Sequence, residues 1–168
     1  PDVEFAFFPV YFLEHGFENP DGHGFSLVSL LLRPKSRGRI TLRSSDPFEP
    51  PVIEANYFAV EADLEVLVEG VKLARRLLQT KAFDRFRGAE VWPGTTVQSD
   101  EAIRGHLIDH FQTVYHPVGT CKMGQDGRAV VDSRLRVHGI EGLRVVDASI
   151  MPTLIGGPLQ GTAVNTFA

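Results

Sequence analysis

A single cysteine occurs in the 168 residues, so an internal disulfide framework is excluded. The chain also lacks a long hydrophobic run, because the longest, at residues 29–32, ends at Arg33 and Pro34. Charge of one sign is not concentrated, since the formal net charge is −4 and Lys and Arg form no stripe. These absences argue against a membrane segment and against nucleic acid or an anionic membrane as the main partner. Sparse cysteine favours a cytoplasmic location.

The residues that are present are typical of a globular domain, with 43% hydrophobic and 23% charged residues. Aromatic and β-branched side chains predict strands at residues 3–13 and 25–32, with Pro9 marking an edge or a bulge in the first. Alternating charged and apolar residues predict a third strand at 39–43. Residues 45–51 contain three prolines and are expected to form an extended connection.

Two helices are predicted further along the chain. In the first, apolar side chains recur at helical spacing, with acidic residues near the start and basic residues near the end. The recurring positions are Val60, Leu64, Leu67, Val71, Ala74 and Leu78. Gly70 is a weak point within this helix. A shorter helix is expected to begin at Ser99, a capping residue followed by two acids, and to run through Phe111.

The last third of the chain contains short apolar segments. Residues 130–131, 135–137 and 143–146 are strand candidates, and the last of them has the apolar character of a buried strand. Short strands together with two helices indicate an α+β fold with an antiparallel sheet toward the N-terminal side.

Two patterns suggest chemistry but lack the context that it needs. The sequence G-H-G-F at residues 22–25 resembles the start of a dinucleotide-binding loop, yet Leu27 occupies the third glycine position and no helix is expected to follow. His106 and His110 are four residues apart on the second helix, a spacing that allows two imidazoles to bind one metal ion. No third ligand is evident, so both patterns favour structural roles and we expect no metal site.

The segment T-V-Y-H-P-V-G-T-C-K-M-G at residues 113–124 allows three interpretations. His116 and Cys121 could bind a metal, could form a nucleophile and its base, or could lie in a turn that presents the histidine alone. Pro117 and Gly119 do not hold the two side chains face to face, which favours a small cysteine packed within a rigid turn. A histidine held in such a loop is suited to general base catalysis near neutral pH.

The same segment resembles the active-site histidine region of the glucose–methanol–choline (GMC) flavoprotein oxidoreductases, especially their choline dehydrogenase-like members. Three further segments resemble this family in the same order and with similar separations. They are L-R-P-K-S-R-G-R at residues 32–39, P-V-I-E-A-N-Y at residues 51–57 and G-L-R-V-V-D-A-S-I-M-P-T at residues 142–153.

The resemblance implies an antiparallel sheet backed by helices and a C-terminal strand that would join an FAD-binding domain. Residues 1–141 would form a region like the substrate-binding domain, and residues 142–168 would return to complete the FAD domain. The main FAD domain would lie in sequence outside this chain. The chain alone is therefore expected neither to retain FAD nor to be active.

The implied reaction is oxidation of a small alcohol to a carbonyl compound, with hydride transfer to the flavin and His116 as the base. The resemblance assigns Gln160 as the second catalytic residue. It also assigns five residues to cofactor binding: Tyr115, Asp147, Ala148, Gly161 and Thr162. Asp147 and Ala148 would lie near the diphosphate and ribityl chain, and Tyr115 would contact the flavin through its backbone.

The chain departs from the family pattern after Thr153. The family continues with G-N-x-N-x-P, whereas here Pro158 replaces the first asparagine and Gln160 replaces the second. The glutamine keeps an amide but is one methylene longer. This departure favours an altered or truncated tail. Two alternatives remain open: a folded module without catalysis, and a flavin-containing protein like the hydroxynitrile lyases.

Overall fold

The computed structural model describes residues 2–18 and 20–156. The chain divides into two compact units, which are described separately. The first unit consists of Pro1–Leu31 and Glu61–Thr113, and the second of Leu32–Val60 and Val114–Ala168. No helix in the described residues has the length and apolar character needed to cross a membrane.

The first unit contains an antiparallel pair of strands, β1 (Val3–Phe8) and β2 (Ser26–Leu31). The pairing runs from Val3 opposite Leu31 to Phe8 opposite Ser26. The first strand is shorter than the predicted range of residues 3–13, because it ends before Pro9, which has no N–H group for a sheet hydrogen bond. A short 3₁₀ helix, η1 (Glu14–Gly16), lies in the connection between the two strands.

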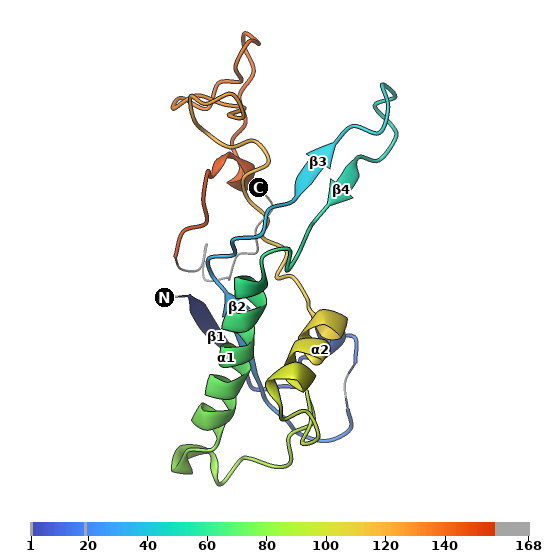
Figure 1. Ribbon diagram of the computed structural model, residues 1–168, viewed down its shortest axis with the longest axis vertical. Coiled ribbons are helices and arrows are strands. Elements are labelled where there is room, and N and C mark those ends of the chain that lie inside the picture. Colours follow the sequence, from blue (N-terminus) through green and yellow to red (C-terminus); the bar gives the residue numbers. More distant parts are fainter. Residues whose placement is uncertain (1, 19, 157–168) are drawn as a thin grey trace. The chain divides into compact units, whose positions relative to one another are not determined.

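The helix α1 (Glu61–Leu78) confirms the predicted periodicity and packs against β2 and α2 (Figure 1). Its buried face includes Leu64, Leu67 and Val68, each no more than 6% exposed. Gly70 suits this packing, since a Cβ atom there would make a tight contact of 3.1 Å with the Cβ of Ser29 on β2. The residue that weakens the helix in isolation therefore allows it to approach the sheet closely.

The helix α2 (Asp100–His110) begins as predicted, with the Ser99 side chain accepting a hydrogen bond from the Ala102 N–H group at 3.1 Å. Ion pairs connect it to α1: Arg104 with Glu61 and Glu65, and Asp100 with Lys72. A short 3₁₀ helix, η2 (Lys81–Phe83), follows α1. In the described residues of the first unit, α1 thus packs against the strand pair and α2 packs against α1 (Figure 1).

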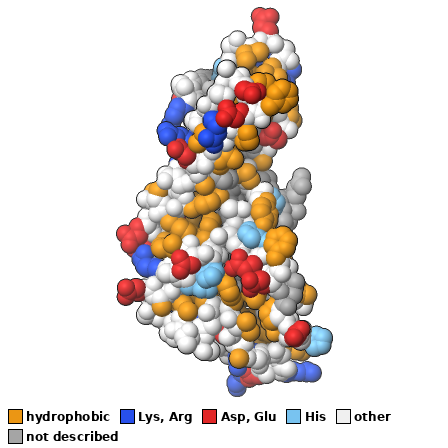
Figure 2. Space-filling view, turned by 90° about the vertical axis from the view of Figure 1, so that its right-hand side faces the viewer, with side chains coloured by type: hydrophobic (Ala, Val, Ile, Leu, Met, Phe, Trp, Pro, Cys, Tyr) orange, Lys and Arg blue, Asp and Glu red, His pale blue; other side chains and the backbone are white. Residues whose placement is uncertain are grey.

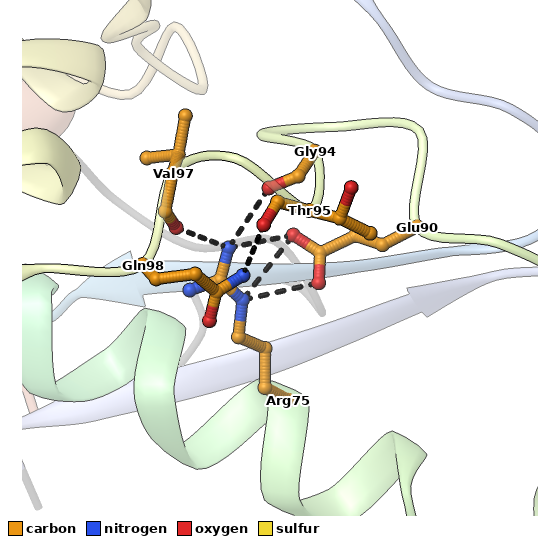
Figure 3. Close-up of polar contacts among 6 residues, drawn as sticks. All are labelled: Arg75, Glu90, Gly94, Thr95, Val97 and Gln98. Carbon is orange, nitrogen blue, oxygen red and sulfur yellow. Dashed lines mark hydrogen bonds and ion pairs between the residues drawn. The ribbon is translucent and has the colours of Figure 1, made fainter.

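Arg75, near the end of α1, holds the loop that leads to α2 (Figure 3). Its guanidinium group donates hydrogen bonds to both carboxylate oxygens of Glu90, the shortest at 2.7 Å. The same group donates to the carbonyl oxygen of Val97 at 2.8 Å and to that of Gly94 at 3.4 Å. Because the Arg75 side chain is only 15% exposed, these charge-assisted hydrogen bonds are shielded from water.

The second unit contains the hairpin of β3 (Arg39–Thr41) and β4 (Val52–Glu54). The strand at residues 39–43 is confirmed in a shorter form, whereas β4 was not predicted. Gly38 allows the hairpin to close, because a Cβ atom there would lie 2.3 Å from the Glu54 carbonyl oxygen. The unit also contains the 3₁₀ helix η3 (Ala148–Ile150).

The predicted strands in the last third of the chain are wrong for the described residues. Val131 forms isolated bridges with Met123 and Val137, and Arg144 forms one bridge with Arg136. Residues 143–146 form no strand, and Val146 is 73% exposed. A single bridge does not continue into a ladder, so the apolar side chains of this segment are left at the surface.

The predicted class is confirmed: antiparallel strands and helices form an α+β structure. The core of the first unit lies between α1 and the strand pair, and Val118 and Val131 are fully buried in the second unit. The predicted domain boundary between residues 141 and 142 stays a prediction.

Replacing Arg75 with Ala should destabilise the first unit by about 1–3 kcal/mol, because Glu90 and two loop carbonyls lose a shielded charged donor. Urea denaturation followed by the fluorescence of Trp92, the only tryptophan, measures this change. The control is Lys72→Ala, also on α1, whose acidic partners are more than half exposed and whose loss should therefore cost clearly less than that of Arg75. Equal losses in the two variants would contradict the role assigned to Arg75.

Candidate active site

The loop that contains His116 is anchored on the C-terminal side of the histidine. Tyr115 has a left-handed backbone with φ of 62°, which is unfavourable for a bulky side chain. His116 is half-buried, and Val118, two residues later, is only 1% exposed. Gly119 has φ of 93°, a conformation that glycine adopts without strain. The loop is therefore anchored next to the histidine.

Three backbone hydrogen bonds attach this loop to the turn at η3. The N–H groups of Gly119 and Cys121 both donate to the Ser149 carbonyl oxygen, at 3.1 and 3.0 Å. The N–H group of Met123 donates to the Ile150 carbonyl oxygen at 2.8 Å. Segments about thirty residues apart in the sequence are thus brought together, and these are the segments that sequence reasoning selected for catalysis and cofactor binding.

The turn that accepts these hydrogen bonds is capped by Asp147. The carboxylate of Asp147 accepts a hydrogen bond from the Ser149 N–H group at 2.8 Å, and the Ile150 N–H group donates to the Asp147 carbonyl oxygen at 3.3 Å. Hydrogen bonding from Ser149 lowers the pKa of the Asp147 carboxyl group, which is exposed to solvent. The donor is the Ser149 backbone N–H group, since the Ser149 hydroxyl oxygen is buried without a hydrogen-bond partner in the described residues. Asp147 is therefore a carboxylate at neutral pH and a fixed part of the turn.

The structure positions some of the predicted site residues and not others. His116, Tyr115, Asp147 and Ala148 belong to the two connected segments. Gln160, Gly161 and Thr162 lie outside the described residues, so their roles stay predictions. Cys121 is a free, half-buried cysteine whose backbone forms part of the turn, consistent with the expected packing role.

Comparison with known proteins decides the family. The model of the GMC oxidoreductase family matches residues 34–166. The chain belongs to this family. It is 42% identical over 164 residues to the oxygen-dependent choline dehydrogenase of Cronobacter sakazakii, and 44% identical over 164 residues to that of Pseudomonas aeruginosa. Both alignments cover 98% of this chain and 29% of the relative, so the chain spans less than a third of their length.

Solved GMC-type structures share the fold of the chain. Pyridoxine 4-oxidase from Mesorbium loti matches with a TM-score of 0.85 at 29% identity, covering 96% of this chain and 32% of the other. A variant of the formate oxidase of Aspergillus oryzae, studied for modification of its FAD, matches with a TM-score of 0.83 at 33% identity, covering 94% and 28%. These similarities confirm the family resemblance that the four sequence segments predicted.

The four GMC-like segments are gathered in one unit. Residues 32–39 and 51–57 form the hairpin region, and residues 113–124 and 142–153 form the His116 loop and the Asp147 turn. All of them except Thr113 belong to the second unit. The family resemblance therefore corresponds to a compact part of the GMC chain, with the candidate catalytic loop within it.

The possible dinucleotide-binding loop at residues 22–25 is an ordinary connection. It leads directly into the strand β2 and not into a helix, so no helix N-terminus is available for a phosphate. A Cβ atom at Gly24 would lie 2.3 Å from the ring of Tyr11, so this glycine serves close packing.

His106 and His110 form an aromatic cluster. Their ring centroids are 4.6 Å apart, and the Trp92 ring meets each of them edge-on, at 5.1 and 4.5 Å. A ring nitrogen of His110 lies 3.3 Å from a Glu14 carboxylate oxygen. Within residues 2–18 and 20–156 no group of three potential ligand side chains could hold a metal ion. The geometry assigns the two histidines to packing between α2 and the loop held by Arg75.

Burial lowers the pKa of His106, and the nearby His110 lowers it further. Arg75 also lowers this pKa, while Asp109 and Glu14 raise it.

The sequence pattern paired the two histidines but did not predict their contact with Trp92, because that contact is formed through a loop with no local pattern. It also did not identify Ser149, although an aspartate side chain commonly accepts a hydrogen bond from the backbone N–H group two residues later.

The free energy of unfolding should fall as the pH drops below the ordinary His pKa of about 6.5, because unfolded His106 takes up a proton more readily than folded His106. His106→Gln should remove part of this loss, measured by urea denaturation between neutral and mildly acidic pH. His23→Gln is the matched control, since His23 is an exposed histidine in a loop of the same unit. An unchanged pH dependence in His106→Gln would show that His106 is not responsible.

Proposed function

We propose that this chain is the substrate-side part of an FAD-dependent oxidoreductase that oxidises CH–OH groups to carbonyls, with His116 as the base. The observation that carries this proposal is the attachment of the His116 loop to the Asp147 turn by three backbone hydrogen bonds. Membership of the GMC family supports the reaction class. Relatives named oxygen-dependent choline dehydrogenase make choline the first alcohol to test.

Tyr115 of the second unit is suited to contact an FAD cofactor. It is 67% exposed beside the half-buried His116, so it offers surface to a large planar ring system. FAD, when bound, supplies the hydride acceptor. Tyr115, Asp147, Ala148, Gly161 and Thr162 are the residues of this chain that we propose to contact it.

The charge of Asp147 restricts how it can contact FAD. Its carboxyl group is ionised at neutral pH, and hydrogen bonding from Ser149 lowers its pKa further. A carboxylate and a diphosphate repel each other, so the Asp147 side chain is not a diphosphate ligand. A contact between this residue and the diphosphate or ribityl chain would be made through backbone groups.

His116 is proposed to accept the proton of the substrate hydroxyl group on a ring nitrogen. A base is useful only when it is positioned next to the reacting carbon, so the rigidity of the loop matters as much as basicity. Pro117 fixes its own φ angle and the buried Val118 anchors the loop, while Gly119 allows the turn that follows. Gln160 is proposed to assist as a second polar group, since its amide can both donate and accept hydrogen bonds.

Residues 142–168 are proposed to complete the FAD domain, and residues 1–141 to form the substrate-side region. In support, Leu143 and Val146 expose apolar side chains although their segment has the composition of a buried strand. Figure 2 shows that hydrophobic side chains reach the surface on the face drawn there. A segment of this composition becomes buried when it pairs with strands of another domain. The chain alone is therefore proposed to be inactive.

In the complete protein loaded with FAD, His116→Ala should slow reduction of the flavin by choline about 10²–10⁴-fold, the usual cost of losing a general base. Stopped-flow absorbance under anaerobic conditions measures this rate, and the FAD content of the variant should equal that of the wild type. Cys121→Ser is the control and should change the rate little, because Cys121 contributes mainly its backbone to the turn.

Two results would overturn the proposal. If Cys121→Ser abolished reduction while His116→Ala did not, the catalytic assignment would be reversed. If the wild-type protein bound FAD but neither choline nor other small alcohols reduced it, a redox-silent activity like that of the hydroxynitrile lyases would replace the oxidoreductase.

A further inference from the structure

We propose that Asp147 is a positioning residue whose carboxylate fixes the turn on which the His116 loop rests. The proposal does not require the side chain to touch the cofactor. Its effect on the loop stands on the structure alone, and its effect on catalysis rests on the function proposed above.

The carboxylate is engaged within its own turn. It accepts a hydrogen bond from the Ser149 N–H group at 2.8 Å, as an N-cap residue does at the start of a helix. Within residues 2–18 and 20–156 it forms no ion pair with Lys, Arg or His. Its contribution is therefore local hydrogen bonding and not long-range charge pairing.

Ser149 transmits this local effect to the catalytic loop. Its N–H group is bound by Asp147, and its carbonyl oxygen accepts hydrogen bonds from both Gly119 and Cys121. Ser149 is thus held by Asp147 through its N–H group and binds the His116 loop through its carbonyl oxygen. Because η3 has only three residues, no regular helix supports this turn independently.

The next residue reinforces the connection. The Ile150 N–H group donates to the Asp147 carbonyl oxygen, and the Ile150 carbonyl oxygen accepts from Met123. Loss of the cap would loosen both carbonyl oxygens that receive the loop. Gly119 lies only three residues after His116, so weaker hydrogen bonds there would leave the imidazole less firmly positioned.

Amide hydrogen exchange of this chain, without flavin, tests the structural part. Asp147→Ala should accelerate exchange at Gly119, Cys121 and Met123 by about 2- to 30-fold, the range expected for loss of an N-cap. Asp147→Asn should restore most of the protection, because asparagine keeps a side-chain oxygen that can cap the turn. Asp46→Ala is the matched control.

The control removes the same kind of contact from another turn of the same unit. The Asp46 carboxylate accepts a hydrogen bond from the Phe48 N–H group at 2.9 Å, again two residues ahead. Asp46→Ala should leave exchange at Gly119, Cys121 and Met123 as in the wild type. Unchanged exchange in Asp147→Ala would overturn the proposal, as would equal acceleration in Asp147→Ala and Asp147→Asn, because charge and not capping would then be responsible.

The catalytic part is tested in the complete FAD-loaded protein with choline. Asp147→Ala should retain FAD but reduce it more slowly at saturating choline, and Asp147→Asn should recover much of the lost rate. If both variants lost FAD, and the loss of FAD accounted for the whole loss of activity, Asp147 would be a cofactor contact and a positioning role would be contradicted. If the wild-type protein shows no flavin reduction, the proposed function fails while the exchange results still decide the role of Asp147.

Discussion

The hydrogen bonds from Gly119, Cys121 and Met123 to the carbonyl oxygens of Ser149 and Ile150 are the constraint on which the candidate site depends. They join backbone groups of the two segments, and the Asp147 carboxylate holds the turn that accepts them. Val118, almost fully buried, anchors the loop, and Gly119 adopts the left-handed conformation that the turn needs. The result is a half-buried imidazole whose backbone is held on its C-terminal side.

The first unit shows the same principle in a different form. Arg75 holds a loop with no regular structure by bonding to the Glu90 carboxylate and to the carbonyl oxygens of Gly94 and Val97. That loop contains Trp92, which packs against the two histidines of α2. In both units, hydrogen bonds to polar groups of a loop fix residues that lie outside helices and strands.

Elements governed by local pattern could be predicted from the sequence. The helix α1 follows from its periodicity and α2 from the Ser99 cap. Elements that depend on distant partners could not be predicted: β4 has three residues next to a proline-rich connection, and Arg75 reaches Glu90 fifteen residues later. Residues 143–146 have the composition of a buried strand but find no strand partner in the described chain. For the site, proline, glycine and the family resemblance identified His116, while its attachment to Ser149 required coordinates.

The central claim is that the loop holds the His116 imidazole against the reacting carbon of an alcohol beside the flavin. A crystal structure of the complete FAD-bound protein with an alcohol or its product analogue tests this most directly. The account predicts a His116 ring nitrogen within hydrogen-bonding distance of the alcohol oxygen, about 2.6–3.2 Å, with the hydrogen bonds to Ser149 and Ile150 intact. An imidazole turned into solvent or into the protein interior, away from the alcohol, would contradict it.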